Sequence, residues 1–496
     1  MFRQLDDETR KVLDLVRELG AAYQPIYLIG GAVRDLAVGR SVSDFDFAVR
    51  EGSLELAAAL RRRLRAGGFT LDDERQTARI IWHAGGPDQL GLDFVRLVGG
   101  SLETDVLQRD FTINTLAVDL NQPDKVIDLL GGLKDLENGW LRAASDQSML
   151  LDPLRVMRGV RMAQAFKLGI APETEGLMRA AAPGLQRVSG ERIRDELFKI
   201  LELPERAASI QLLYSCKALE NFAPEFLPLM ELPAYAPHVH PLWEHTLRVV
   251  FWLERILKLG QAAGDGSALP EALAQIDSTF KPLQGLLRGW FDALLTGGRS
   301  RRGLFFLAAL CHDIGKPAAK SIDEAGRAHF YGHAEAGQQP AVAIARRLML
   351  ANDEVEYLKR MVQGHMRPHL LASAEGELSS RAIYRYYRDL GSCGVDLAVL
   401  SLADLLATYE DQLSAEKLNR EVETARLLLL GWFTRKEEVV APKALLSGHD
   451  LLAMGLQPGR QLGQLLEDLR EAQAAGQVRD EDEARRFVQS RIQEEK

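Results

Sequence analysis

Cysteine, excess positive charge and long apolar runs are all scarce in this 496-residue chain. Its three cysteines, Cys216, Cys311 and Cys393, are odd in number and far apart, which argues against a disulfide framework and fits a reducing cytoplasm. No segment approaches 18 uncharged apolar residues, and the acidic, amphipathic start lacks the features of a signal peptide. We therefore expect neither secretion nor a membrane partner.

The overall charge does not indicate a general nucleic-acid-binding protein. Lysine and arginine number 61 against 70 acidic residues, for a formal net charge of −9, whereas such proteins usually carry a basic surface. Residues 141–210 are different, with 11 Lys/Arg against 9 Asp/Glu. A local basic groove could hold a compact RNA end, recognised by its shape over a limited surface.

The periodicity of apolar residues divides the chain into a mixed head and a helical remainder. Strands are predicted at 25–30, 45–50, 79–84 and 90–97 and a helix at 54–66, whereas from about residue 150 the period becomes 3.6 and no strand is expected. Helices are predicted at 150–166, 173–182, 190–202, 206–217 and 242–258. The predicted class is α+β, with a small mixed-sheet head (1–140), a helical neck (141–230), a helical body (231–440) and a C-terminal helical tail (441–496). Loop-like stretches at 264–267 and 296–302 bound a predicted insertion in the body, at about 264–302.

Two aspartates in the head, Asp44 and Asp46, stand in the alternating stretch Ser-Asp-Phe-Asp-Phe. On a strand, the i, i+2 spacing points both carboxylates to one face, where they repel each other unless a divalent cation lies between them. Alone, such a pair is more typical of a solvated strand end. A third acid, Asp93, lies on another alternating stretch, and three carboxylates could position two metal ions.

A glycine turn precedes this pair. The apolar run 26–29 breaks at Gly30 and Gly31 and continues as Ala-Val-Arg-Asp, the pattern of a strand, a turn and the start of a helix. Glycines let the backbone approach a triphosphate closely, and a helix N-terminus with Arg34 favours anionic oxygens. Together with the aspartates, the turn predicts a nucleotidyl-transfer site that uses Mg²⁺.

Further along, a charged pair leads into an apolar stretch that we predict to be a strand, in the sequence Arg109-Asp110-Phe-Thr-Ile-Asn114. Arg109 could reach a phosphate, while Asp110 and Asn114 could bond sugar hydroxyls or hold the backbone. A purely structural ion pair is an equally open interpretation.

The predicted neck begins with a row of arginines behind Asp152. Pro153 is suited to the first turn of a helix, on which Arg155, Arg158 and Arg161 follow at i, i+3 and i+6 and share one face. That face could meet phosphates, bases or solvent, and the solvated face is the more common case. Asp152 and Arg155 together offer acceptors and donors that could read the edge of a base.

Four motifs in order resemble those of class II tRNA nucleotidyltransferases and bacterial poly(A) polymerases. They are Gly30-Gly31-x-Val33-Arg34-Asp35 with Asp44-x-Asp46, Arg109-Asp110-Phe111-Thr112-x-Asn114, Asp152-Pro153-Leu154-Arg155-x-x-Arg158-x-x-Arg161, and Glu191-Arg192-Ile193-Arg194-x-Glu196-Leu197. The resemblance covers about residues 20–230. It implies template-independent addition of CMP, or of CMP and AMP, to tRNA 3′ ends from CTP and ATP. The tail at 441–496 is similar to the family's tRNA-elbow-binding segment, although a capping helical subdomain is nearly as compatible with it.

The resemblance also implies roles for these positions. Asp44 and Asp46 would hold Mg²⁺, and Asp93 or a metal-bound water would assist the attack of the hydroxyl. Gly30, Gly31, Arg34 and Arg109, with Asp110 and Asn114, would surround the triphosphate and sugar. Asp152 and Arg155 would pair with the incoming base, and Arg158 and Arg161 would bind phosphate.

Two departures from the family pattern stand out. Leu151 precedes Asp152 where the family commonly has a glutamate, so a supporting carboxylate is missing. Members that add a complete CCA tend to carry a longer flexible segment before the Arg-Asp motif, whereas only residues 95–107 intervene here. The short segment is similar to that of enzymes that add CC and leave the final A to a separate A-adding partner. CC-only and full CCA addition both stay open.

The body carries a separate set of metal-ligand residues. Eight of the ten histidines fall between positions 238 and 369, and His312-Asp313 ends an apolar helical stretch. The ordered set resembles a binuclear HD phosphohydrolase domain, which implies a divalent metal (Mg, Mn, Ni or Fe) and activation of water against a phosphate ester. Its members are His245, His312, Asp313, His333, His365 and Asp404. By family analogy, the substrate would be a phosphate or cyclic phosphate at a damaged RNA end.

Two alternative functions are also compatible with parts of the sequence. A poly(A) polymerase or an A-adding enzyme would share the head motifs. A phosphohydrolase with a head that only senses nucleotides would not need Asp44 and Asp46, and their presence argues against it.

Overall fold

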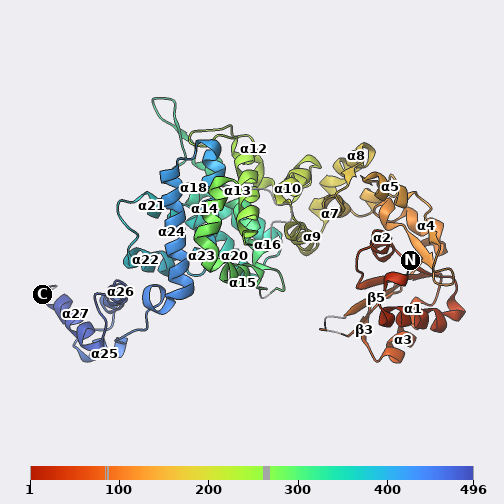
Figure 1. The fold of residues 1–496 in the computed structure, drawn as a ribbon, viewed down its shortest axis with the longest axis horizontal. Helices are drawn as coiled ribbons and strands as arrows, with labels where there is room; N and C mark the ends of the chain where they lie inside the picture. Colours follow the sequence, from red (N-terminus) through yellow and green to blue (C-terminus); the bar gives the residue numbers. More distant parts are fainter. Residues whose placement is uncertain (1, 84, 87–88, 261–268, 296, 495–496) are drawn as a thin grey trace. The chain divides into compact units, whose positions relative to one another are not determined.

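The structure is a computed structural model, and it describes residues 2–83, 85–86, 89–260, 269–295 and 297–494. The chain divides into two compact units. Unit 1 comprises residues 1–196 and 212–221, and unit 2 comprises residues 197–211 and 222–496. Unit 1 contains a mixed sheet and unit 2 is almost entirely helical (Figure 1). The predicted α+β class is confirmed.

Unit 1 is built on a seven-stranded sheet with the strand order β3-β4-β5-β2-β1-β6-β7. Its strands are β1 (Ile26–Ile29), β2 (Asp44–Val49), β3 (Gly67–Asp72), β4 (Thr77–Trp82), β5 (Leu90–Arg96), β6 (Ala117–Asp119) and β7 (Val126–Ile127). The helices of the head are α1 (Asp7–Leu19), α2 (Gly31–Ala37), α3 (Ser53–Leu64), α4 (Leu102–Leu107) and α5 (Gly132–Asn138). The central pair β2 and β5 is parallel, and the other pairs are antiparallel. The edge strand β3 was not predicted because its alternating part, Phe69 to Asp72, is only four residues long and follows two glycines.

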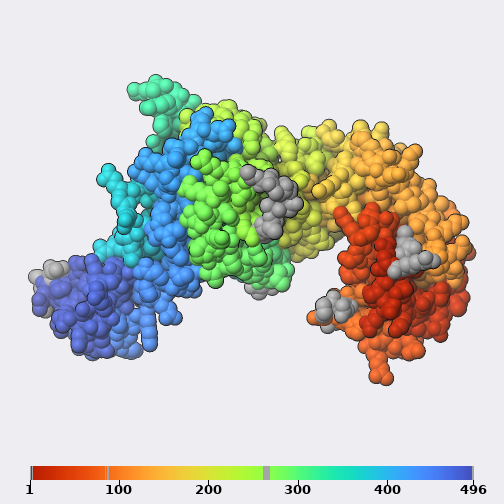
Figure 2. All heavy atoms as spheres, viewed as in Figure 1, coloured from red at the N-terminus to blue at the C-terminus, as the bar shows by residue number. Residues whose placement is uncertain are grey.

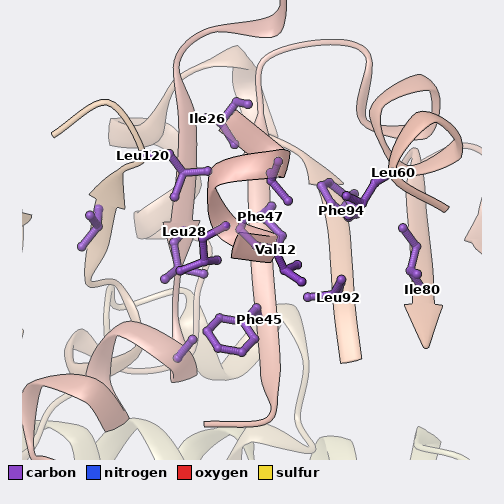
Figure 3. Packing of buried hydrophobic residues seen from close by; sticks show 14 of the residues in the cluster. Val12, Ile26, Leu28, Phe45, Phe47, Leu60, Ile80, Leu92, Phe94 and Leu120 are labelled. Atoms are coloured by element: carbon purple, nitrogen blue, oxygen red, sulfur yellow. The ribbon is translucent and has the colours of Figure 1, made fainter. Parts of the chain in front are cut away.

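The alternation in β2 separates the core from the candidate site. Phe45 and Phe47 are buried against α1 and α3 in the main core of the head (Figure 3). Phe47 stacks on Phe94 of β5 with ring centroids 5.0 Å apart. Because successive side chains point to opposite faces, Asp44 and Asp46 emerge on the other face of the sheet. Burial of the phenylalanines thus fixes the register that presents the carboxylates.

The neck starts with two helices where one was predicted. Helix α6 (Ser148–Leu151) ends before Pro153, and α7 (Arg155–Phe166) begins after it. Asp152 between them is extended, with φ −149° and ψ 102°, because the residue before a proline avoids the helical region. The remaining elements are β8 (Trp140–Leu141), β9 (Gly169–Ile170), α8 (Pro172–Ala181), α9 (Gly190–Glu202), α10 (Arg206–Ser215) and α11 (Leu219–Phe222).

Unit 2 is organised around the apolar helix α23 (Cys393–Tyr409), which is buried on nearly all sides and packs against α13, α20 and α24. A helix that is apolar all round belongs in the interior of a domain. The helices of this body are α12 (Leu227–Met230), α13 (Leu242–Leu257), α14 (Glu271–Phe280), α15 (Gln284–Asp292), α16 (Arg301–Cys311), α17 (Lys316–Ala319), α18 (His333–Ala336), α19 (Gln338–Arg347), α20 (Asn352–Gly364), α21 (Arg367–Ser373), α22 (Ser380–Leu390) and α24 (Ala415–Thr434). The tail holds α25 (Gly448–Ala453), α26 (Arg460–Ala474) and α27 (Glu481–Glu494), which form a small core of their own.

The expectation that strands end at about residue 150 was wrong. Besides β9, the strands β10 (Ser321–Ile322) and β11 (Ala328–His329) form an antiparallel hairpin, which stands out from the surface of unit 2 (Figure 2). Strands of two residues are too short to give an alternating pattern in the sequence.

The predicted insertion contains helices α14 and α15. The loop predicted at 264–267 lies outside the described residues, and α16 begins at Arg301, within the second predicted loop. All three cysteines are buried and unpaired. Among the described residues no single helix is long and apolar enough to cross a membrane, although the bent pair Ser380–Leu390 and Cys393–Gln412 passes by length and composition.

Candidate functional site

Three carboxylates of the head meet on one face of the sheet. Asp44 and Asp46 lie two residues apart on β2, and Asp93 is the register partner of Asp46 on the parallel neighbour β5. Asp44 is largely exposed, whereas Asp46 and Asp93 are more enclosed. The structure thus brings together all three predicted acids.

The pKa values of the enclosed carboxyls reflect this crowding. Burial, together with the charges of Asp46 and Asp44, raises the pKa of Asp93 to about 6 against the attraction of Arg79. Burial also raises the pKa of Asp46, although Arg109 opposes the shift. Asp93 Oδ1 is buried and has no hydrogen-bond partner among the described residues. Crowded carboxylates with an unsatisfied oxygen fit a divalent cation, which would relieve their repulsion.

An arginine outside the predicted motifs lies against these acids. Arg79 of β4 is the register partner of Asp93. Its Nη2 is 2.5 Å from Asp44 Oδ1, and its Nε is 3.5 Å from Asp93 Oδ1. The predicted strand at 79–84 contained the residue, but nothing in the sequence paired that strand with the one carrying Asp93.

The glycine turn is formed as predicted, between β1 and α2. Gly30 has φ +74° and ψ −132°, a conformation that favours glycine. A Cβ atom at Gly30 would lie 3.1 Å from Arg109 Nη1 and 3.8 Å from Asp46 Oδ2, so the turn adjoins both groups. Arg34 is largely buried, donates to Asp35 and Asn114, and lies over the ring of Phe166. Most of its donors are therefore occupied by protein groups.

The Arg-Asp motif is held by an inward hydrogen-bond network. Its apolar stretch starts as a 3-10 turn, Thr112–Asn114, and not as the predicted strand, which begins only with β6. Asp110 Oδ2 accepts from Nε and Nη2 of Arg158 at 3.0 and 2.8 Å, and its Oδ1 accepts from Asn114 and from the backbone N–H of Phe111. Burial alone would raise the pKa of Asp110, but Arg158 and Asn114 hold it below its usual value. The ion pair is with Arg158 of the neck and not with the adjacent Arg109, which binds Asp105 at 2.8 Å.

The three neck arginines face different partners. Arg155 Nη1 donates to the backbone oxygens of Ser148 and Arg109, at 2.9 and 3.1 Å. Arg158 reaches Asp110, and Arg161 pairs with the buried Glu196 of α9. They therefore do not form the continuous basic ridge that their spacing allowed.

The predicted base-reading residue Asp152 is held from both sides. Its Oδ1 accepts the backbone N–H of Leu154 at 3.2 Å, and its Oδ2 accepts from Arg192 of α9 at 2.6 Å. Arg192 belongs to the fourth motif, where sequence alone gave it no role.

In unit 2 the six predicted metal ligands converge from the helices α13, α18 and α23 and from the segments that directly follow α16 and α20. Three groups have ligand atoms within 4.8 Å of one another: His245, His312 and Asp404; Asp313, His333 and His365; and His238, His245 and Asp313. Asp313 connects them, because its Oδ2 faces His245 and His312 at 3.5 and 3.2 Å while its Oδ1 lies 3.5 Å from both His333 and His365.

The hydrogen bonds of these histidines fix which nitrogen can bind a metal. His312, His333 and His365 place Nδ1 against the backbone oxygens of Ala309, Phe330 and Val362 at 2.7–2.8 Å. When Nδ1 carries the proton, Nε2 keeps its lone pair for a metal. His312 Nε2 and both ring nitrogens of His245 are buried and make no well-aligned hydrogen bond among the described residues, although oxygens of Asp313 and Asp404 lie near the two Nε2 atoms. These atoms fit one or two bound cations.

The cluster also contains groups that were not predicted. Lys316 Nζ lies 2.6 Å from Asp313 Oδ2 and 2.9 Å from His238 Nε2. Burial and Lys316 lower the pKa of His238 to about 3. Although burial opposes the charged form of His369, Glu421 and Asp404 raise its pKa to about 10. The cluster opens into a cavity of about 670 Å³ that is also lined by Tyr331, Lys417 and Arg420.

Family models match three stretches of the chain. "Poly A polymerase head domain" matches residues 26–142, "Probable RNA and SrmB- binding site of polymerase A" matches residues 167–230, and "HD domain" matches residues 242–416.

Similar proteins match over nearly the whole chain. A CC-adding tRNA nucleotidyltransferase of Thermus thermophilus is 33% identical over 93% of this chain and 92% of its own length. The chain belongs to the class II tRNA nucleotidyltransferase and poly(A) polymerase family. It is a nucleotidyltransferase. Among other members, an A-adding tRNA nucleotidyltransferase of Deinococcus radiodurans is 31% identical over 93% of this chain and 94% of its own length.

Solved structures of the family share the fold. A CCA-adding enzyme in complex with ATP superposes with a TM-score of 0.65 at 21% identity, covering 99% of this chain and 97% of the other. The Thermotoga maritima CCA-adding enzyme complexed with tRNA gives a TM-score of 0.61 at 22% identity, with 99% and 97% covered.

Within this family fold, the motifs predicted which residues assemble but missed their counter-charges. Arg79, Lys316 and Arg192 each contact a predicted site carboxylate. Lys316 stands three residues after Asp313, a helical spacing that could have pointed to the pair. His369 stands four residues after His365 and offered a similar signal.

Proposed function

We propose that the chain adds nucleotides to the 3′ end of tRNA, using CTP or ATP and Mg²⁺ at the head. The observation that carries this proposal is the convergence of Asp44, Asp46 and Asp93 on one sheet face beside the Gly30 turn. The full-length likeness to a CC-adding enzyme of Thermus thermophilus supports tRNA as the substrate.

The three head carboxylates would have different roles in the transfer of the nucleotide. The oxygen of the tRNA 3′ hydroxyl attacks the α-phosphorus, and pyrophosphate leaves. Asp44 and Asp46 would hold Mg²⁺, which neutralises charge that develops on the phosphates. Asp93, with a pKa of about 6, is basic enough to accept the proton of the attacking hydroxyl.

The surrounding residues place the nucleotide. The backbone at Gly30 and Gly31 leaves room for the triphosphate, and Arg109 lies beside Asp46 and contributes positive charge. Arg158 keeps over a third of its side chain exposed, so it remains a candidate for phosphate contact. Arg34 donates to Asn114, which in turn donates to Asp110. These three buried side chains would support the nucleotide site and not bind the nucleotide directly.

Base selection is assigned to Asp152 and Arg155. A carboxylate can accept from the amino group of cytosine or adenine, and a guanidinium can donate to ring acceptors. Both side chains are oriented by hydrogen bonds, Asp152 by Arg192 and Arg155 by two backbone oxygens. Arg161 and Glu196 connect α7 to α9 and hold this arrangement in place.

We favour CC-only addition, which requires a separate A-adding enzyme. The short segment before the Arg-Asp motif is anchored by Asp105, whose Oδ1 accepts from the backbone of Val98 and whose Oδ2 accepts from Arg109. A segment tied at both ends is poorly suited to a specificity switch that needs motion. CC-adding relatives from Thermus thermophilus and Geobacter sulfurreducens, each matched over 93% of this chain, support the same choice.

A-addition is the second candidate, because the Deinococcus radiodurans A-adding enzyme is 31% identical over 93% of this chain. Incubation with Mg²⁺ and tRNA transcripts lacking CCA, ending in C, or ending in CC, with CTP and ATP separately and together, distinguishes the cases. Growth that stops at CC supports the proposal, and completion to CCA overturns the segment argument. AMP addition only to CC-ended tRNA identifies the A-adding enzyme. Unlimited AMP addition to unrelated RNA would indicate a poly(A) polymerase.

We further propose that unit 2 hydrolyses a phosphate ester at an RNA end. A divalent metal (Mg, Mn, Ni or Fe) would be held by the buried ring nitrogens of His245 and His312 that make no aligned hydrogen bond. The other ligands would be Asp313, His333, His365 and Asp404. The bound metal would activate water. Lys316 beside Asp313 adds a positive charge on the cavity wall that can attract the phosphate.

Paired variants test whether the two sites are separate. Replacing His312 and Asp313 with alanine should abolish phosphate release from an RNA with a terminal phosphate or 2′,3′-cyclic phosphate, while CMP addition is kept. The double variant Asp44→Asn, Asp46→Asn should abolish CMP addition and keep phosphate release. His83→Ala removes a half-exposed histidine of the head and serves as the control for both activities. Loss of both activities in a folded His312 and Asp313 variant would contradict separate sites.

A further inference from the structure

Arg79 occupies the space between two of the three head carboxylates. Its guanidinium bridges Asp44 Oδ1 at 2.5 Å and Asp93 Oδ1 at 3.5 Å. It is brought there by register, since β4 pairs with β5 and β5 with β2, so that Arg79, Asp93 and Asp46 stand in one row across three strands. Because Asp44 stands two residues before Asp46 on the same strand, one positive charge lies beside three acids.

A glycine makes room for this ion pair. Gly91 of β5 is the register partner of Asp44, and a Cβ atom there would overlap Asp44 Oδ1 and lie 3.0 Å from Arg79 Nη2. A larger residue at position 91 would force the side chains of Asp44 and Arg79 to shift. The ion pair between Arg79 and Asp44 therefore depends on the strand register and on the glycine at position 91, as well as on Arg79 itself.

The Asp44 carboxylate that Arg79 contacts is one of the groups that the proposed metal ion would use. A divalent cation attracts a carboxylate more strongly than a guanidinium does, and it also repels the guanidinium. About a third of the Arg79 side chain is exposed, so a route into solvent exists for it. Metal entry and the bridge to Asp44 thus oppose each other.

We propose that Arg79 is a resident counter-ion that competes with the divalent cation for Asp44. It keeps the carboxylates together in the metal-free head and lowers their affinity for free metal, so that the ion is held firmly only when nucleotide phosphates supply further ligands. This positioning role depends on the proposed metal site at Asp44 and Asp46.

Binding of Mn²⁺ to the full-length chain tests the competition without any activity measurement. Free Mn²⁺ is measured by electron paramagnetic resonance at low ionic strength in the absence of nucleotide, with His312→Ala and Asp313→Ala as the background that silences unit 2. Removing the positive charge with Arg79→Gln should tighten binding about tenfold. Arg75→Gln is the matched control, because Arg75 precedes the same strand but is highly exposed and lies by Asp72. It should change the affinity less than about twofold.

Unchanged or weaker Mn²⁺ binding by Arg79→Gln would overturn the proposal, and weaker binding would mean that Arg79 only braces the ligands. Arg79→Lys retains the charge without the planar fork that bridges two acids, so it should bind Mn²⁺ a few-fold more tightly than the unaltered chain. This second variant decides the question if the glutamine variant does not fold. If Asp44→Asn leaves Mn²⁺ binding unaffected, the proposed metal site itself fails, whatever Arg79 does.

Discussion

Replacing Asp93 with asparagine should stabilise the metal-free protein while abolishing nucleotide addition. The pKa of Asp93 is about 6 in the folded chain against 3.8 for an unperturbed aspartate. A raised pKa means that folding favours the protonated carboxyl. Its stabilising contribution is complete below pH 3.8 and is lost as the pH rises through 6. At neutral pH the wild-type head therefore carries an ionised carboxylate at a cost that asparagine avoids.

The magnitude follows from the shift. About two pKa units correspond to roughly 3 kcal/mol once Asp93 is fully ionised in the folded state. At pH 5 the wild-type carboxyl is mostly protonated, and linkage reduces the difference to about half of that. The pKa of about 6 already includes the attraction of Arg79, 3.5 Å away. Because Asp93 is partly open to solvent, which weakens these interactions, we expect a net gain of about 1–3 kcal/mol at pH 7.5. For a domain of about 200 residues this raises the midpoint of unfolding by several degrees, at about 2–4 °C per kcal/mol.

Thermal unfolding in EDTA at pH 7.5 and pH 5 measures the effect. Asp73→Asn makes the same chemical change at an exposed position in the turn between β3 and β4 and should leave the midpoint unchanged. Added Mg²⁺ should stabilise the wild type more than Asp93→Asn, because the variant lacks the negative charge of Asp93 that helps to attract a cation to Asp44 and Asp46. The reasoning would be refuted if Asp93→Asn unfolds at a lower temperature in EDTA at pH 7.5, or if its advantage is as large at pH 5.

Three further substitutions test the supports of the head site. Asp110→Asn leaves Arg158 without its buried partner and should destabilise unit 1 by about 2–3 kcal/mol, measured by urea unfolding; a double-mutant cycle with Arg158→Met should recover part of the loss. Arg192→Gln frees the carboxylate of Asp152 and should raise the KM for CTP several-fold and increase misincorporation of other nucleotides, with kcat changed less, as measured by steady-state kinetics with each triphosphate. Gly91→Ala places a Cβ atom against Asp44 and should lower the affinity for Mn²⁺ at least tenfold, while the circular dichroism spectrum stays close to that of the wild type. An unchanged affinity would contradict the close packing of Gly91 against Asp44.

The parts of the fold that could be predicted from sequence are those with a strong repeating pattern. The alternation around Phe45 and Phe47 and the long apolar stretch ending at Cys311 both gave elements close to those observed. Elements were missed where other effects decided. The exposed edge strand β3 is held by pairing with β4, and one predicted neck helix became two because Pro153 and the extended Asp152 interrupt it.

The candidate sites were predictable to the extent that their ligands lie in local motifs. Asp44 and Asp46 are two residues apart, and His312 adjoins Asp313, so spacing alone pointed to each pair. Which side chain neutralises which acid could not be predicted, because these contacts cross strands or helices that are distant in sequence. Asp110, for example, is paired with an arginine 48 residues away and not with its neighbour.

Each candidate metal site contains a positively charged side chain, Arg79 in the head and Lys316 in unit 2. The two side chains differ in how deeply they are buried. Lys316 is 5% exposed and is held between Asp313 Oδ2 and His238, so moving it would strand an ammonium in the interior. Metal ligation by Asp313 is therefore easiest through Oδ1, which faces His333 and His365. Arg79 is about a third exposed and contacts the accessible Asp44, so it can leave for water at little cost. A fixed cation suits a site whose metals stay bound during turnover, and a movable one suits a site that receives its metal with each nucleotide.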